Sequence, residues 1–108
     1  MAMLAQEQAR ILFFNDRHDR LLDEKVEFGT TSEVSVRCRD IVRHAFTLNA
    51  PALIFVHNHP SGNPEPSEQD ILFTRTFITV CKEMEITVLD HIIIAADGTC
   101  SFRERGYM

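Results

Sequence analysis

The sequence has no long apolar run, and this absence bears on whether the protein is expected in a membrane. Even one of its longest apolar stretches, around Ile92–Ala96, has only the length of a strand and falls far short of the ~20 residues that a helix needs to cross a bilayer. The residues from Met1 to Gln6 lack the basic start and apolar stretch of a signal peptide. No repeat or interdomain linker is visible. We therefore expect one domain over residues 1–108, in the cytoplasm and without contact to a membrane.

Paired cysteines and surplus positive charge are also missing. The three cysteines, Cys38, Cys81 and Cys100, form no C-x-x-C pair, so we expect reduced cysteines buried in the core. The formal net charge is −5, which leaves no surplus of cations to attract a polyanion. The charge balance thus weighs against direct nucleic-acid binding by this domain.

The spacing of apolar residues predicts an α/β (α+β) domain with the order β-β-α-β-α-β-β. Turn and breaker residues separate the elements, as with Asp97-Gly98 between the last two strands. We predict strands at 9–14, 21–28, 52–56, 86–95 and 99–103, and helices at 39–49 and from Ser67 onward. This order favours a mixed β-sheet flanked by helices.

The segment most informative about function follows the apolar run 52–56. His57 and His59 are two residues apart at the end of that strand, so both rings point to the same side. A short loop rich in proline and glycine then leads into a helix whose first turn contains Asp70. Two imidazoles and one carboxylate leave a fourth tetrahedral position free, which is the pattern of a catalytic zinc site. Structural zinc sites favour cysteine, and no cysteine is near this segment.

Each part of this segment also has an ordinary structural interpretation. A histidine at a strand end is usually a hydrogen-bonded structural residue. Ser67 and Asp70 form S-x-x-D, which alone indicates a helix capping box. Asp90 and His91 fit an ordinary polar pair at the start of a strand. The conjunction of two histidines, a tight turn and a carboxylate favours the metal site, and Ser67 can cap the helix while Asp70 points at the metal.

The same residues carry a resemblance to a known family. His57-Asn58-His59, seven intervening residues, and Ser67-Glu68-Gln69-Asp70 reproduce the H-x-H, seven residues, S-x-x-D motif of the JAB/MPN domain of the JAMM metalloprotease type. H-N-H-P-S-G followed by P-S-x-x-D resembles the RadC branch more narrowly. The likeness extends to Leu89-Asp90-His91 and to Ser101-Phe102, so it covers nearly the whole chain.

The resemblance implies a role for each residue. His57, His59 and Asp70 would bind Zn²⁺, and Ser67 would stabilise the oxyanion beside the metal. The family places its general-base glutamate before the first strand, which Glu7 matches best; a solvated residue near the terminus is its ordinary interpretation. The remaining candidates are Glu24 and Glu27 for the base, and Asp90 and His91 as residues that support the ligands from behind.

The resemblance further implies a zinc metallopeptidase or isopeptidase that cleaves an amide bond in a peptide or protein with a zinc-activated water. The alternative is a non-catalytic module for protein interaction, or one associated with DNA repair, a link that the RadC branch carries by name. A zinc deaminase would need H-x-E…P-C-x-x-C, which this sequence lacks. Exposed strand edges allow a homodimer.

Overall fold

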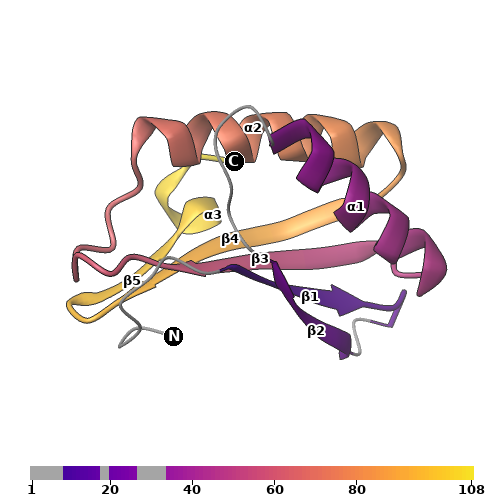
Figure 1. Cartoon of the computed structure of the whole chain (residues 1–108), viewed down its shortest axis with the longest axis horizontal. Coiled ribbons are helices and arrows are strands. Elements are labelled where there is room, and N and C mark those ends of the chain that lie inside the picture. The colour runs from indigo at the N-terminus through magenta and orange to yellow at the C-terminus, as the bar shows by residue number, and fades with distance from the viewer. Residues whose placement is uncertain (1–8, 18–19, 27–33) are drawn as a thin grey trace.

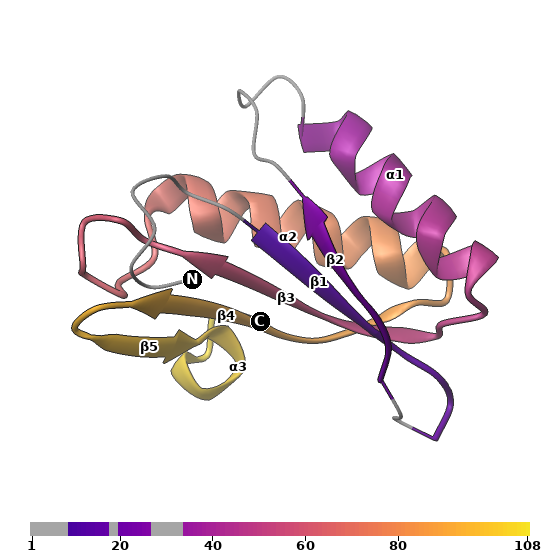
Figure 2. The same ribbon diagram turned by 60° about the horizontal axis from the view of Figure 1, so that its bottom comes forward.

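The computed structural model describes residues 9–17, 20–26 and 34–108 and has two layers, a sheet and the helices that pack on it (Figure 1). Figures 1 and 2 show the two long helices, α1 and α2, on the same face of the sheet. The elements are β1 (Ala9–Phe14), β2 (Arg20–Val26), α1 (Val34–Thr47), β3 (Ala52–Asn58), α2 (Glu68–Glu83), β4 (Thr87–Ala95), β5 (Gly98–Ser101) and α3 (Phe102–Arg105).

The sheet is mixed, as the sequence predicted. Its five strands follow the order β2-β1-β3-β4-β5. β3 and β4 are parallel, because α2 carries the chain back across the sheet between them, and the other neighbouring pairs are antiparallel. β3 therefore lies in the middle, with hydrogen-bonded neighbours on both sides.

The main core lies between the sheet and the two long helices. In β1 the buried residues alternate with half-buried ones, which is the period of a strand with one covered face. In α1 the buried residues recur at helical spacing. The cluster includes Ile11 and Phe13 of β1, Leu53 and Phe55 of β3, Cys38, Ile41, Val42 and Ala45 of α1, and Phe77 and Cys81 of α2.

The structure differs from the predicted elements mainly at their ends. The prediction of a last strand running to residue 103 is wrong, because β5 ends at Ser101 and α3 begins at Phe102. The Ser101 side chain accepts a hydrogen bond from the backbone N–H of Glu104, and Gly106 ends the helix in a left-handed conformation with φ 78°. The first helix starts five residues earlier than predicted, at Val34 instead of Arg39.

The described part of the chain contains no helix that is both long and apolar enough to span a membrane. Cys38, Cys81 and Cys100 are all buried and free of disulfides, as expected from their spacing. Burial raises the pKa of the Cys38 thiol to about 11 and that of Cys81 to about 12, where the charge of Cys38 adds to the effect. Both thiols therefore behave as small apolar core residues.

We expect Phe77→Ala to lower the free energy of unfolding by about 3–5 kcal/mol, because it removes an aromatic ring from the centre of the core. Phe77 is 1% exposed and contacts Phe55 edge to face at 5.8 Å between ring centroids. Leu72→Ala on the same helix is the control, since Leu72 is 63% exposed and its loss should change stability by less than about 0.5 kcal/mol. Equal effects in denaturant titrations would contradict the packing of α2 described here.

Candidate metal centre

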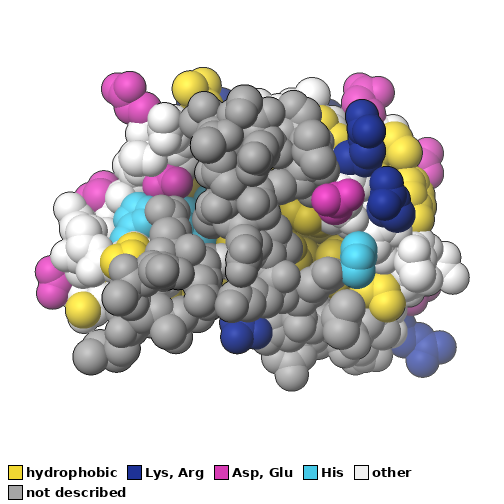
Figure 3. All heavy atoms as spheres, viewed as in Figure 1, with side chains coloured by type: hydrophobic (Ala, Val, Ile, Leu, Met, Phe, Trp, Pro, Cys, Tyr) yellow, Lys and Arg dark blue, Asp and Glu magenta, His cyan; other side chains and the backbone are white. Residues whose placement is uncertain are grey.

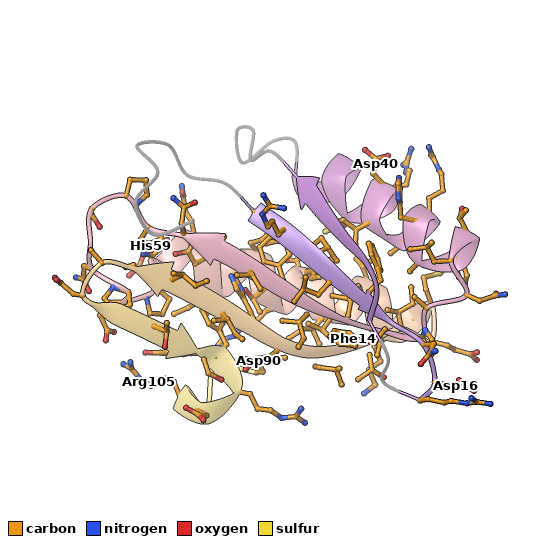
Figure 4. All side chains as sticks on the ribbon, turned by 90° about the horizontal axis from the view of Figure 1, so that it is seen from below. Phe14, Asp16, Asp40, His59, Asp90 and Arg105 are labelled. Carbon is orange, nitrogen blue, oxygen red and sulfur yellow. The ribbon has the colours of Figure 1, made fainter. Side chains whose placement is uncertain are left out.

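The three residues singled out by their spacing meet where β3 ends and α2 begins. Figure 4 shows His59 at this end of the molecule, with Asp16 at the opposite end. In the space-filling view, histidine side chains reach the surface near the start of α2 with an acidic side chain beside them (Figure 3). His57 belongs to β3, and its Cα pairs with Ala9 of β1 and with Ile93 of β4. The backbone of the first histidine is thus held by strands on both sides.

The ligating atoms of His57, His59 and Asp70 all lie within 4.8 Å of one another. The two Nε2 atoms are 3.0 Å apart, and Asp70 Oδ2 lies 3.0 Å from Nε2 of His59. Asp70 Oδ1 is 3.6 Å from Nε2 of His57. The side chain of His57 is fully buried, whereas those of His59 and Asp70 are 14% and 13% exposed. The cluster is therefore closed at its base and reachable from solvent.

This donor set fits a metal ion. Lone pairs of two neutral imidazoles and one carboxylate converge on a single point, where they repel one another unless a cation or a shared proton lies between them. Histidine nitrogen and carboxylate oxygen are ligands that zinc and other divalent transition metals accept. The described residues thus contain a His-His-Asp group that could hold a metal ion.

The orientation of His59 is determined by the loop that follows it. Its Nδ1 lies 3.0 Å from the carbonyl oxygen of Asn63, and a carbonyl can only accept a hydrogen bond. Nδ1 therefore carries a proton, and Nε2 faces His57 and Asp70. The backbone N–H of His59 donates to the carbonyl of Ile94 at 3.0 Å, which ties the start of the loop to β4.

His57 is backed by a second buried histidine. Its Nδ1 lies 2.6 Å from Nε2 of His91, whose Nδ1 lies 2.5 Å from the hydroxyl of Thr74 on α2. The ring of His91 stacks on Phe102 at 4.1 Å between centroids. Burial lowers the pKa of His57 to about 4 against the opposing effect of Asp70, and burial holds that of His91 well below its usual value. Both rings are therefore neutral near pH 7.

Ser67 and Asp70 form the capping box that S-x-x-D indicates. The Ser67 hydroxyl accepts from the backbone N–H of Asp70 at 3.1 Å, and Asp70 Oδ2 accepts from the backbone N–H of Ser67 at 2.8 Å. The same Oδ2 faces His59. Capping and metal binding are therefore geometrically compatible, and the cap fixes the direction of the Asp70 carboxylate.

The structure separates the predicted pair Asp90 and His91. Consecutive residues of a strand point to opposite faces, and only His91 contacts the histidine cluster. Asp90 accepts hydrogen bonds from the Ser101 hydroxyl at 2.5 Å and from the backbone N–H of Arg103 at 3.1 Å. Its Oδ1 also accepts from the backbone N–H of His91 at 2.7 Å. The contacts with Ser101 and Arg103 tie β4 to the start of α3.

The candidate general bases cannot be located in the same way. Glu7 and Glu27 lie outside the described residues, and the side chain of Glu24 does as well. Glu24 belongs to the edge strand β2, where its Cα pairs with Ile11. Glu7 precedes Ala9 by two positions in the sequence, and Ala9 is the residue of β1 that pairs with His57.

Two features of the site were missed in the sequence. The Asn63 carbonyl orients His59, and backbone groups leave no mark in side-chain spacing. Thr74 reaches His91 from α2, and its position four residues after Asp70 does place it on the same helix face. The spacing from Asp70 to Thr74 was the signal that the sequence offered, but it does not indicate that Thr74 contacts His91.

The loop between the histidines and α2 is also held from outside. The Arg105 guanidinium donates to both carboxylate oxygens of Glu65, each at 3.1 Å. This fork joins the loop to the end of α3 with a fixed relative orientation. Figure 4 shows Arg105 at this side of the molecule, below β5.

The comparison with known protein families identifies one family whose profile this chain matches. Residues 1–107 match the profile of the RadC-like JAB domain. The match covers nearly the whole chain, including both histidines and the helix that provides Asp70. This chain belongs to the RadC-like JAB domain family.

Proposed function

We propose that this domain is a zinc-dependent hydrolase that cleaves an amide bond, as a metallopeptidase or isopeptidase of the JAMM type. The observation that carries this proposal is the convergence of three ligand atoms within 4.8 Å at a site whose outer side is open to solvent. Three protein ligands leave a fourth position for water or substrate, as catalytic zinc sites do. A peptide or protein is the substrate that such chemistry implies.

His57, His59 and Asp70 would hold the zinc. When bound, zinc polarises a carbonyl oxygen and lowers the pKa of a coordinated water towards ~7. Ser67 would donate to the oxyanion that develops on the substrate, since its oxygen accepts from Asp70 N–H while its own proton stays available for donation. Glu7 would take the proton of the attacking water and deliver it to the leaving amine. Its support is the register of β1, which pairs Ala9 with His57.

The other properties expected from the sequence are part of the same proposal. The acidic net charge of −5 favours a protein substrate over direct binding to nucleic acid. The edge strands β2 and β5 offer surfaces on which a homodimer could form. The cytoplasmic location stays a prediction.

We expect the purified protein to contain about one zinc per chain, and His59→Ala to lose it because one of three ligands is gone. His44→Ala on α1 is the matched control. His44 is exposed, and its ring stacks on Phe13, away from the His-His-Asp cluster. Elemental analysis of the three proteins measures this directly. Protein that is free of zinc and refuses added zinc would contradict the proposal and favour a non-catalytic interaction module.

Glu7→Gln should keep the zinc and lower kcat by about 10²–10⁴, because the amide cannot accept the water proton. The assay is hydrolysis of a panel of peptides and of conjugates joined through a lysine side-chain amide. Glu24→Gln and Glu27→Gln are the matched controls and should retain full activity. Loss of turnover in one of these variants, with Glu7→Gln active, would transfer the role of base to the other glutamate.

Ser67→Gly separates the two roles of Ser67. Glycine replaces serine at a helix N-cap with a loss of only about a few tenths of a kcal/mol, whereas alanine loses about 1 kcal/mol. If the hydroxyl stabilises the oxyanion, Ser67→Gly lowers kcat by about 10²–10³ with its zinc content and melting temperature nearly unchanged. Full activity in this variant would restrict Ser67 to helix capping.

A further inference from the structure

A continuous chain of buried polar contacts runs from α2 to the ligating side of His57. The Thr74 hydroxyl donates to the carbonyl of Asp70 at 2.7 Å and also contacts Nδ1 of His91. Nε2 of His91 contacts Nδ1 of His57, and Nε2 of His57 faces His59 and Asp70. Thr74, His91 and His57 are exposed by 1%, 2% and 0%, so bulk water does not compete for these contacts.

The order of donors along this chain follows from the carbonyl at its end. A carbonyl can only accept, so the single hydroxyl proton of Thr74 points at Asp70. The hydroxyl oxygen must then accept from His91, which places the one proton of that neutral ring on Nδ1. Nε2 of His91 is left as an acceptor, and the only proton that His57 can share with it is on Nδ1. Nε2 of His57 therefore keeps its lone pair.

We propose that Thr74 is a positioning residue that selects, through His91, the tautomer of His57 in which Nε2 carries a lone pair for the metal instead of a proton. This inference rests on the proposed metal site for its purpose, although the tautomer itself is a property of the metal-free protein. It differs from the arrangement at His59, whose tautomer is set directly by a backbone carbonyl. The tautomer of His57 is thus set by Thr74 on α2, which acts through the intervening ring of His91.

The opposite arrangement becomes available when the hydroxyl is absent. His91 can then place its proton on Nε2 and donate to Nδ1 of His57, which leaves the His57 proton on Nε2, directed at the other ligands. In that tautomer a metal can bind only after a buried N–H is removed or moved. Loss of partners behind a metal-binding histidine typically weakens metal affinity by about 10–100-fold, and we expect Thr74→Val to fall in that range.

Three variants test the inference. Thr74→Val keeps the shape of the side chain and removes the hydroxyl, and Thr74→Ser restores it. Thr79→Val is the matched control, because Thr79 lies on the same helix, and its hydroxyl donates to the carbonyl of Arg75, four residues earlier, at 2.9 Å in an exposed position. The readouts are ¹⁵N NMR of the histidine ring nitrogens in zinc-free protein at neutral pH, and zinc affinity measured by competition with a chelator.

We expect wild type, Thr74→Ser and Thr79→Val to show His57 and His91 protonated at Nδ1 and to bind zinc alike. Thr74→Val should lose this pattern and bind zinc about 10–100-fold more weakly. A proton on Nε2 of His57 in the wild type overturns the inference even if Thr74→Val does not fold. Unchanged ring spectra and zinc affinity in folded Thr74→Val overturn it as well. Wild-type protein that shows the expected tautomers but refuses zinc refutes the proposed hydrolase and leaves the tautomer assignment intact.

Discussion

The middle position of β3 is the constraint on which the rest of the structure depends. This strand is hydrogen-bonded to β1 on one side and to β4 on the other, up to and including His57. Its inward residues Leu53 and Phe55 anchor the core, and His57 continues the same alternation at the point where the core ends. The packing that stabilises the fold therefore also holds the backbone of His57, so the candidate site begins on a strand that is paired on both sides.

The carboxylate of Asp70 is placed by the start of a helix. Its Oδ2 accepts the backbone N–H of Ser67 and faces the histidines at the same time. A negative charge at a helix N-terminus is stabilised by the unpaired N–H groups of the first turn. Because the cap determines where the carboxylate points, the start of α2 also positions Asp70 beside the two histidines.

Buried polar groups behind the cluster orient the ring of His57. Neutral His57 and His91 can be tolerated in the interior only because each ring nitrogen has a partner. Phe102 stacks on His91 from α3, and Asp90 caps the start of α3 from the opposite face of β4. The short carboxyl-terminal helix, which has no ligand of its own, thus contributes to the site by closing the space behind the second histidine.

Much of this arrangement was readable from local patterns. Apolar alternation predicted β1 and the position of β3, while His57, His59 and the S-x-x-D turn predicted three ligands at one point, because strand and helix periods are local properties of the chain. The end of the last strand was not predictable in this way, because the residues after Ser101 also suit a strand. The Ser101 cap and the left-handed conformation of Gly106 make this segment a helix instead.

The sequence by itself determined the order of elements, the capping box and the residue types of the site, all of which depend on near neighbours along the chain. Only the tertiary structure decided that His91 lies behind His57 while Asp90 does not, and that Thr74 reaches His91 from α2. These contacts join residues 34 and 17 positions apart. Their partners are chosen by the register of β3 on β4 and by the packing of α2 on the sheet, which no local pattern encodes.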